Sequence, residues 1–211
     1  MGALSKSSII ERLRNGELTI SPIMMAKQIG ASSVDLRMGT VVLIARAGGQ
    51  SHVEPRAYLK ESSAPTDHDT IRDKKQKHER FDVPYGESFL LHPGALALVP
   101  TLEWVKLPHD LQGVVTARSS WAREGLSIAT ATIINPGYAG IVTLELANLG
   151  DVPMRLYPGL RLAQIALYEL TCADIESDQA TAQNSQFHMS FEPSGGNIAG
   201  DDGPFISMRK S

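Results

Sequence analysis

The apolar residues of the chain fall into short runs from Ser33 onward, and polar or turn-forming residues separate these runs. Clear examples are residues 41–44, 89–91 and 96–99, which consist of Val, Leu, Ile, Ala and Phe. Such short runs suit β-strands better than helices, which need a longer periodic pattern. The pattern after residue 20 therefore predicts strands and no long helix.

The connections between these runs carry turn signals. Pro-Gly pairs occur at residues 93–94, 136–137 and 158–159, each between apolar runs. In a type II turn, proline presets the first central dihedral angle and glycine accepts the positive φ of the second. Repeated short strands with such turns predict an all-β fold, as a sandwich, a jelly roll or a barrel.

Two segments outside the strand pattern have simple interpretations. Ser8 and Glu11 fit a capping box, which predicts a short N-terminal helix that ends at Gly16. The segment 67–82 is dense in charges of both signs, which is typical of a solvated loop or insertion. Neither segment predicts chemistry of its own.

The segment 171–211 loses the strand rhythm and becomes rich in glycine near its end, which is typical of a mobile chain end. Its apolar side chains argue that it nevertheless docks, on its own body or on a neighbour. These side chains are Phe187, Met189, Phe191, Phe205 and Ile206.

Composition narrows the class of protein. The 211 residues, 42% of them hydrophobic, suit one domain with a mobile end. The 20 Lys and Arg against 23 Asp and Glu give a net charge of −3, which disfavours a general nucleic-acid binder. No apolar run approaches the roughly 20 residues of a membrane span, and the first residues match neither a signal peptide nor a myristoylation motif. We expect a cytoplasmic protein without nucleic-acid or membrane partners.

Several catalytic motifs can be excluded. Cys172 is the only cysteine, so an internal disulfide and a Cys-based zinc site are ruled out, and we expect a reduced thiol. H-E-x-x-H, G-x-S-x-G, G-x-x-x-x-G-K-[ST] and G-x-G-x-x-G are absent. The six histidines are scattered along the chain. A Ser/His/Asp triad could still assemble in space, but nothing in the sequence favours one.

Glu145 lies at the centre of an otherwise apolar predicted strand that begins at Ile141. Alternation along a strand puts its side chain on the face opposite to Leu144 and Leu146. The carboxylate is either exposed at a sheet edge or turned towards a cavity, where partial desolvation would raise its pKa towards that of a useful general base. Taken alone, an exposed edge position is the more common explanation.

A second candidate is the polar segment Arg118, Ser119 and Ser120, which Arg123 follows. Guanidinium groups, hydroxyls and backbone amides so close together suit phosphate oxygens. A basic turn with serine capping would have the same sequence, so the string is weak evidence by itself.

Six segments in fixed order resemble the dCTP deaminase family of the dUTPase superfamily, over most of residues 4–170. They are residues 32–37, 101–108, 117–126, 135–138, 143–148 and 156–164. The resemblance implies a distorted β-barrel or jelly-roll domain over 1–170 and a tail over 171–211 that closes over the active site or a neighbouring subunit. It also implies a homotrimer with active sites at the subunit interfaces.

The implied reaction is hydrolytic deamination of dCTP to dUTP and ammonia without zinc, which supplies deoxynucleotides for dTTP synthesis. The chain indeed lacks the H-x-E…P-C-x-x-C signature of zinc deaminases, so a carboxylate must activate the water. Magnesium would arrive with the triphosphate, bound mainly by phosphate oxygens and waters, and dTTP becomes a candidate feedback inhibitor.

The resemblance also assigns roles. Glu145 matches the catalytic glutamate, which takes a proton from water and delivers it to cytosine N3. Ser119 would hold that water and Arg123 would orient the substrate. The remaining substrate-binding candidates are Arg118 and Ser120 at the phosphates, Trp121 and Ala122 beside them, Thr143 and Leu144 beside the base, Ala131 over the pyrimidine, and Asn135, Gln164 and Gln186 as polar contacts.

The chain departs from the family pattern at three places. Ala117 replaces a glycine, and Asn135 replaces an aspartate, so a carboxylate expected at the pocket becomes a neutral amide. Asn135 thereby argues against release of diphosphate. Gln186 and Phe187 stand where a Lys-Tyr pair is typical, with Ser190 further on, which removes a point charge from the triphosphate side. Arg209 and Lys210 could substitute for it.

Two alternatives to a dCTP deaminase remain open. One is a bifunctional deaminase and diphosphatase that releases dUMP, or a plain dUTPase, against which Asn135 argues. The other is a nucleotide-binding protein that keeps the fold and has lost or altered its catalysis, as the changes at Asn135 and Gln186 would allow.

Overall fold

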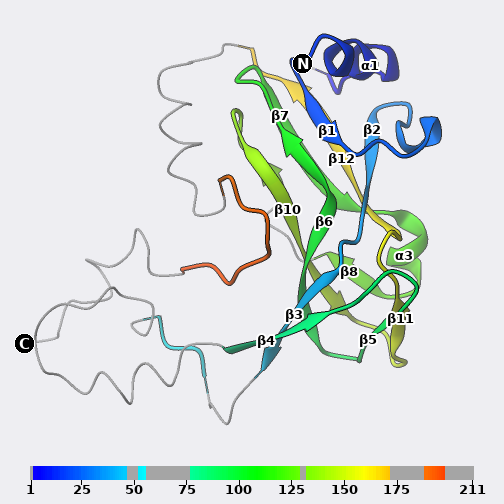
Figure 1. Ribbon diagram of the computed structural model, residues 1–211, viewed down its shortest axis with the longest axis vertical. Helices are drawn as coiled ribbons and strands as arrows, with labels where there is room; N and C mark the ends of the chain where they lie inside the picture. The colour runs from blue at the N-terminus through cyan, green and yellow to red at the C-terminus, as the bar shows by residue number, and fades with distance from the viewer. Residues whose placement is uncertain (1, 47–51, 56–76, 129–131, 172–187, 198–211) are drawn as a thin grey trace, which may run out of the picture. The chain divides into compact units, whose positions relative to one another are not determined.

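The computed structural model describes residues 2–46, 52–55, 77–128, 132–171 and 188–197 (Figure 1). The chain divides into two compact units. The larger unit consists of Met1–Ile44 and Arg80–Ser194, and the smaller unit of Ala45–Glu79 and Gly195–Ser211. All the described candidate residues lie in the larger unit.

One sheet has four antiparallel strands in the order β2, β12, β7 and β9. Their bounds are Ser33–Arg37, Arg161–Glu169, Leu111–Ala117 and Ile133–Ile134. Gln164 of β12 lies opposite Asp35 of β2 on one side and Thr116 of β7 on the other. The sheet thus brings together three segments that are far apart in the sequence.

A second sheet runs in the order β4, β3, β6, β10 and β8, and β1 pairs with β6 as its sixth strand. In chain order the bounds are Thr19–Ser21 for β1, Val41–Arg46 for β3, Lys77–Asp82 for β4, Leu96–Lys106 for β6, Leu126–Ile128 for β8 and Ala139–Asn148 for β10. A separate pair joins β5 (Phe89–Leu91) to β11 (Met154–Leu156). β10 pairs with β6 over most of its length, whereas β8 covers only its last residues.

The predicted N-terminal helix is present as α1, and two short helical turns occur elsewhere. Their bounds are Lys6–Arg14 for α1, Ala26–Gln28 for the 3-10 turn η1, and Ser119–Arg123 for α3. The cap of α1 is Ser5 and not Ser8, because the Ser5 hydroxyl accepts a hydrogen bond from the Ser8 backbone N–H at 3.3 Å. Gly16 follows the helix with φ of 74°, as predicted.

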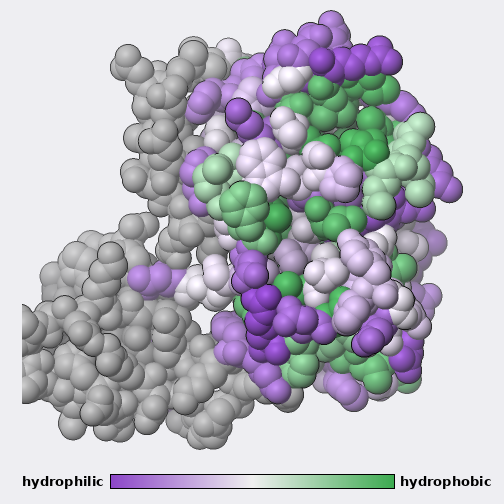
Figure 2. Space-filling view, in the orientation of Figure 1, coloured by the Kyte–Doolittle hydropathy of each residue, from purple (hydrophilic) through white to green (hydrophobic). Residues whose placement is uncertain are grey.

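The surface of α1 agrees with its amphipathic sequence. Ile9 is fully buried, whereas the outer surface of the helix, at the top of the view, is hydrophilic (Figure 2). Arg12 ties the helix to Asp110 at 2.7 Å and to Glu169 of β12 at 3.2 Å. Among the described residues, no helix is long and apolar enough to cross a membrane.

The predicted all-β class and its turns are confirmed. The glycines of the three Pro-Gly pairs, Gly94, Gly137 and Gly159, have φ of 72°, 73° and 90°. In each turn a backbone hydrogen bond joins the residue after the glycine to the carbonyl before the proline. The core consists of aliphatic side chains from both large sheets, such as Leu36 and Leu144, which are fully buried.

The prediction of a solvated loop over 67–82 is wrong for its last residues. Lys77–Asp82 forms strand β4 next to β3. Phe81 packs against the core and Arg80 binds Glu192, so this part of the charged segment has partners that a loop would lack. Residues 67–76 lie outside the described part of the chain.

Residues 188–194, which we call the tail segment, pair with the beginning of β10. The Met189 N–H donates to the Ala139 carbonyl at 2.6 Å, and the Ile141 N–H donates to the Ser190 carbonyl at 3.0 Å. The predicted docking of the tail on its own body is therefore confirmed for these residues. It is made by backbone groups.

An ion pair adds to this contact. Arg80 NH1 lies 2.6 Å from Glu192 Oε2, and NH2 donates to Oε1 at 3.2 Å. The expectation that apolar side chains hold the tail is not met at Met189 and Phe191, which are 52% and 70% exposed. The other apolar tail residues, Phe187, Phe205 and Ile206, lie outside the described residues.

Candidate active site

Glu145 lies on the face of β10 that alternation predicts. Its neighbours Leu144 and Leu146 are fully buried, whereas Glu145 is half-buried on the opposite face. Burial raises the pKa of its carboxyl group. No hydrogen bond or ion pair reaches this carboxylate from the described part of the chain. A desolvated carboxyl group without a fixed partner is free to exchange a proton with a ligand.

Two partners pair with the edge of β10 that faces away from β6, one at its beginning and one at its end. The Ile141 N–H points away from β6 and donates to the tail segment. The Val142 N–H points towards β6 and donates to the Thr101 hydroxyl at 3.0 Å. Because successive backbone groups of a strand alternate sides, those of Thr143 and Glu145 face the same way as those of Ile141. Among the described strands, β8 takes over this edge only from Leu146 onward.

The segment 118–123, which the sequence predicts to bind phosphate, lies in the connection between β7 and β8. Arg118 precedes α3, and the side chains of Ser119, Ser120, Ala122 and Arg123 on this short helix are exposed. Their hydroxyl and guanidinium groups are therefore accessible to a ligand.

Trp121 fastens the same helix to the sheet. It is half-buried against the core, and its indole N–H donates to the Arg161 carbonyl of β12 at 3.1 Å. The Arg118 backbone N–H donates to the Leu162 carbonyl at 2.9 Å. The segment is thus held against β12 at two neighbouring residues.

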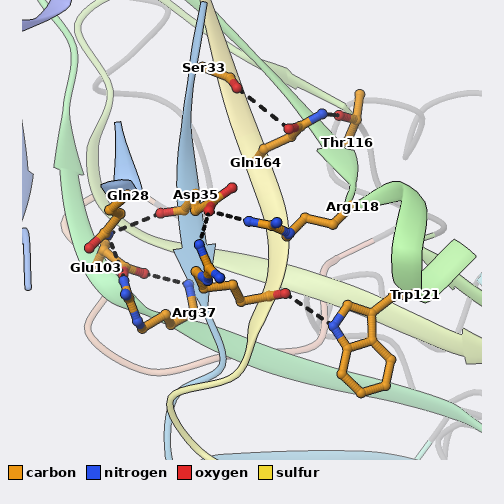
Figure 3. A network of polar contacts seen from close by, with 10 residues as sticks. Gln28, Ser33, Asp35, Arg37, Glu103, Thr116, Arg118, Trp121 and Gln164 are labelled. Carbon is orange, nitrogen blue, oxygen red and sulfur yellow. Dashed lines mark hydrogen bonds and ion pairs between the residues drawn. The ribbon is translucent and has the colours of Figure 1, made fainter. Parts of the chain in front are cut away.

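A polar cluster surrounds Asp35 of β2 (Figure 3). Asp35 Oδ2 accepts hydrogen bonds from Arg118 and, at 2.9 Å, from Arg161 NH1. Gln164, which lies opposite Asp35 in the register, donates to the Thr116 hydroxyl at 3.3 Å and accepts from the Ser33 hydroxyl at 3.4 Å. The structure therefore brings two sequence candidates, Arg118 and Gln164, to one region.

A second polar cluster is buried beside the first. Glu103 of β6 is fully buried and accepts hydrogen bonds from the Arg37 backbone N–H at 2.7 Å, from Arg37 NH1 at 3.2 Å and from Gln28 at 2.9 Å. Burial raises the pKa of the Glu103 carboxyl, while the hydrogen bonds from Arg37 oppose this shift. Gln28 also donates to the Asp35 backbone carbonyl at 3.0 Å, so the two clusters are connected.

Glu103 lies within an irregularity in β6. Opposite Ile141 and Thr143 of β10, the strand β6 is longer and bulges. The Thr101 hydroxyl repairs the interrupted ladder, because it accepts from the Val142 N–H and donates to the Glu103 carbonyl at 2.7 Å. Thr101 thus links this part of β6 to β10 just before Glu145.

The remaining candidates have different positions. Asn135 is exposed and begins the turn between β9 and β10. The side chain of Leu144 is fully buried, so it offers no exposed surface to a base, whereas Thr143 is half-buried on the same face as Glu145. Ala131 and Gln186 lie outside the described residues.

Within the described chain, no hydrogen bond or ion pair joins Glu145 to the residues of α3 or to Gln164. The candidates form two groups, one at β10 and one around Asp35. No three or more His, Cys, Asp or Glu side chains of the described residues gather as a metal site. The donors around α3 are guanidinium and hydroxyl groups, which suit phosphate oxygens better than a divalent cation.

A model of the dCTP deaminase-like domain matches residues 3–170 of the chain. The chain belongs to the dCTP deaminase-like family. This confirms the resemblance that the ordered segments predicted.

Curated relatives of this family member cover most of its length. A protein of Dictyoglomus thermophilum named dCTP deaminase, dUMP-forming, is 37% identical over 187 residues, which are 88% of this chain and 89% of the relative. A protein of Halorubrum lacusprofundi named dCTP deaminase is 38% identical over 170 residues, 79% of this chain and 77% of the relative. The relatives thus carry two names that differ in the product.

A solved structure supports the fold. The 2′-deoxycytidine 5′-triphosphate deaminase of Agrobacterium tumefaciens matches with a TM-score of 0.59 and 20% identity, over 88% of this chain. The family member spans about half of that solved chain, 53% of its length. At this identity the likeness concerns the fold, and it agrees with the predicted dUTPase-like all-β domain.

Sequence reasoning missed most residues of the polar clusters, among them the charged residues Asp35, Glu103 and Arg161. These three lie within segments that carry the family resemblance, but nothing in their local sequence gave them a role. Their partners are distant: Asp35 is 83 residues from Arg118 and 126 residues from Arg161. Each is a charged residue between two apolar neighbours, and this was the one signal that could have marked them.

Proposed function

We propose that this family member converts dCTP and water to dUTP and ammonia, with Glu145 as the general base and acid and without zinc. The observation that carries the proposal is the Glu145 carboxyl group, which is half-buried and has no partner among the described residues. Desolvation keeps such a group basic enough to take a proton from water.

The proton balance assigns Glu145 two steps. The carboxylate takes a proton from the attacking water while the oxygen bonds to C4 of cytosine, and it passes this proton to N3. The remaining hydroxyl proton then moves to the amino group, the C4–N4 bond breaks and ammonia leaves with C4 as a carbonyl. Ser119 would hold the water and Arg123 would orient the base.

The base is proposed to lie against Thr143, whose backbone groups face away from β6, on the same side of β10 as those of Glu145. Those groups can exchange hydrogen bonds with the edge of a pyrimidine in the way that a neighbouring strand would. Ala131 would lie over the ring as a small residue. Leu144 contributes to this arrangement by packing β10 against the core.

The triphosphate is proposed to bind at Arg118 and Ser120, with Gln164 and Gln186 as further polar contacts. Arginine forks fit phosphate oxygens, and exposed hydroxyls complete the contacts. These donors are cationic or neutral, so the magnesium ion would remain on the phosphate oxygens and their waters. Trp121 and Ala122 would shape the same helix.

We further propose a homotrimer with active sites between subunits. The support is the separation of the candidates into two groups, since a subunit interface could join Glu145 of one chain to the phosphate group of another. A monomeric mass in light scattering at micromolar concentration would contradict this. On the basis of the family resemblance we also propose dTTP as a feedback inhibitor. Adding dTTP to the ammonia-release assay tests this.

The product is the point on which two candidate functions differ. Asn135 supplies no carboxylate to activate a second water, which favours dUTP. The name of the Dictyoglomus thermophilum relative favours the other candidate, a dUMP-forming enzyme in which dCTP and two waters give dUMP, ammonia and pyrophosphate.

The experiment that tests the proposal follows ammonia and pyrophosphate separately, with purified full chain, magnesium and dCTP, CTP, dCMP or dUTP. Ammonia from dCTP without pyrophosphate is the expected result. Equal amounts of both products would establish the dUMP-forming reaction, with Asn135→Asp as the variant for comparison. No product, together with a rise of the melting temperature by dCTP, would identify a nucleotide-binding protein without this chemistry.

A further inference from the structure

The carboxylate of Asp35 holds two arginines at once. Arg118 and Arg161 both donate to the same oxygen, Oδ2. The Asp35 side chain is 12% exposed, whereas those of Arg118 and Arg161 are 29% and 33% exposed. The cluster therefore buries its negative charge and presents its two positive charges to solvent.

Buried side chains hold the backbone of β2 on both sides of Asp35 in the sequence. The Gln28 side chain donates to the Asp35 backbone carbonyl at 3.0 Å and to Glu103, and Glu103 accepts from the Arg37 backbone N–H at 2.7 Å. All three supporting residues are buried. Asp35 is thus a rigid acceptor, and the arginines adapt to its position.

The charges of the two clusters do not balance. Arg37 is matched by Glu103, and both are buried. Asp35 is then the one carboxylate shared by Arg118 and Arg161, which leaves an excess of one positive charge at the exposed end. A guanidinium group has five N–H donors, and a single donor of each arginine reaches Asp35. Among the described residues no other side chain accepts from these two guanidinium groups, which suits their remaining donors to a ligand.

Arg161 is also attached to the helix of the proposed phosphate site. Its backbone carbonyl accepts from Trp121 of α3, and the exposed Ser119 and Ser120 lie on that same helix. Arg118 directly precedes α3. The two guanidinium groups and the two hydroxyls thus belong to one fastened unit.

We infer that Arg161 is a second phosphate-binding arginine of this site and that Asp35 is the positioning residue that aims Arg118 and Arg161 at the triphosphate. The inference rests on the proposed function and extends it, because the sequence assigned the phosphate contacts to Arg118 and Ser120 and gave Arg161 no role. Sharing one buried acceptor sets the spacing of the two guanidinium groups before the nucleotide arrives, which reduces the entropy lost on binding.

The test is the steady-state release of ammonia from dCTP by the full chain with Arg161→Gln, Arg161→Lys or Arg155→Gln. Arg155 is the matched control, because it is exposed on β11 and its contact is to Ser88. We expect Arg161→Gln to raise KM for dCTP by about 10- to 100-fold, as for the loss of a charge-assisted hydrogen bond, with kcat nearly unchanged. Arg161→Lys should give an intermediate KM, and Arg155→Gln the wild-type KM.

A purely structural role for Arg161 predicts another pattern. The variants would then lose melting temperature or active enzyme while KM for dCTP stayed at the wild-type value, and the inference would be overturned. If Arg161→Gln does not fold, Arg161→Lys decides: a raised KM supports the phosphate contact, and a wild-type KM contradicts it.

The positioning role of Asp35 is tested by a double-mutant cycle. Asp35→Asn should raise KM, and adding it to Arg161→Gln should raise KM by much less than the product of the two single effects, because both act on the same guanidinium. Independent effects would refute the positioning role.

The outcome separates this inference from the proposed function. If the wild-type chain releases no ammonia, the proposed function fails, and the rise of melting temperature caused by dCTP replaces KM as the measure of binding. Arg161→Gln should then abolish that rise. An active wild type with unchanged KM in both Arg161 variants would refute only the role of Arg161.

Discussion

Glu103 and Glu145 lie on neighbouring strands of the same sheet, and burial raises the pKa of both. Glu103 is fully buried and accepts three hydrogen bonds, from Gln28 and Arg37. Glu145 is half-buried and has no partner among the described residues. The two buried carboxylates therefore differ in how completely they are paired.

The difference has an energetic reason. A buried carboxylate is costly unless hydrogen bonds and an opposite charge compensate it. Glu103 has that compensation, so its burial fixes the position of β2. Glu145 lacks it, which costs stability and leaves the proton affinity that a general base needs. Four substitutions or conditions would break or sharpen this contrast.

The largest effect is expected at the unpaired glutamate. Glu145→Gln should lower kcat for ammonia release by about 10²- to 10⁴-fold, the usual contribution of general acid–base catalysis. Because no ion pair is lost, the melting temperature should not fall. Glu87→Gln, in an exposed turn, is the control. A variant that kept wild-type kcat would show that Glu145 is not the base.

The paired glutamate should show the opposite pattern. Glu103→Gln leaves the Arg37 charge buried without a counter-charge, and breaking a buried ion pair typically costs about 3–5 kcal/mol. Urea denaturation measures this loss, and Glu11→Gln on the exposed face of α1 is the control. Below its melting transition, the folded variant should retain most of kcat. A Glu103→Gln variant with wild-type stability and low kcat would contradict the structural role assigned to Glu103.

The pH dependence should follow Glu145. The carboxylate must be ionised to accept a proton, so kcat should fall on the acidic side at a higher pH than an exposed glutamate would give. The sign for stability is opposite to that of a salt-bridged carboxylate. Because the folded pKa is raised, the folded state binds the proton more tightly, and the free energy of unfolding falls as pH rises through the window between the ordinary and the raised pKa.

The variant Glu145→Gln tests both pH dependences, that of kcat and that of the free energy of unfolding. In this variant the acidic limb of the residual activity and the corresponding fall in the free energy of unfolding should disappear. A limb that persisted unchanged would assign the titration to another group.

The smallest effect is expected at the exposed ion pair of the tail segment. Glu192→Gln removes the partner of Arg80, but exposed pairs contribute little to global stability, so the melting temperature should stay constant. Hydrogen exchange should become faster at the amides of Met189 and Ile141, which join the tail segment to β10. Unchanged exchange would show that the backbone pairing alone holds the segment.

The sequence predicted features that depend on neighbouring residues. The Pro-Gly turns and the alternation around Glu145 depend on chain geometry within a few residues, and both are confirmed. The helix cap was displaced from Ser8 to Ser5. Ser8 has a glutamate three residues on and fits the capping box, but a serine hydroxyl can cap a helix without that glutamate, as Ser5 does.

The polar clusters could not be predicted, because they depend on contacts between distant strands. Glu103 and Arg37 are 66 residues apart and meet because the fold brings β6 against β2. The end of the charged segment became β4 for a similar reason, since β3 and the tail segment offer partners that composition does not reveal.

The tail segment has a consequence for the behaviour of the protein in solution. An unpaired strand edge is a template on which other chains can add, and this promotes aggregation. By pairing with Ala139 and Ile141, the tail segment covers the beginning of the β10 edge with the chain's own backbone. Proteolytic loss of residues 188–194 would expose that edge and favour self-association, so these residues protect solubility whether or not a nucleotide is bound.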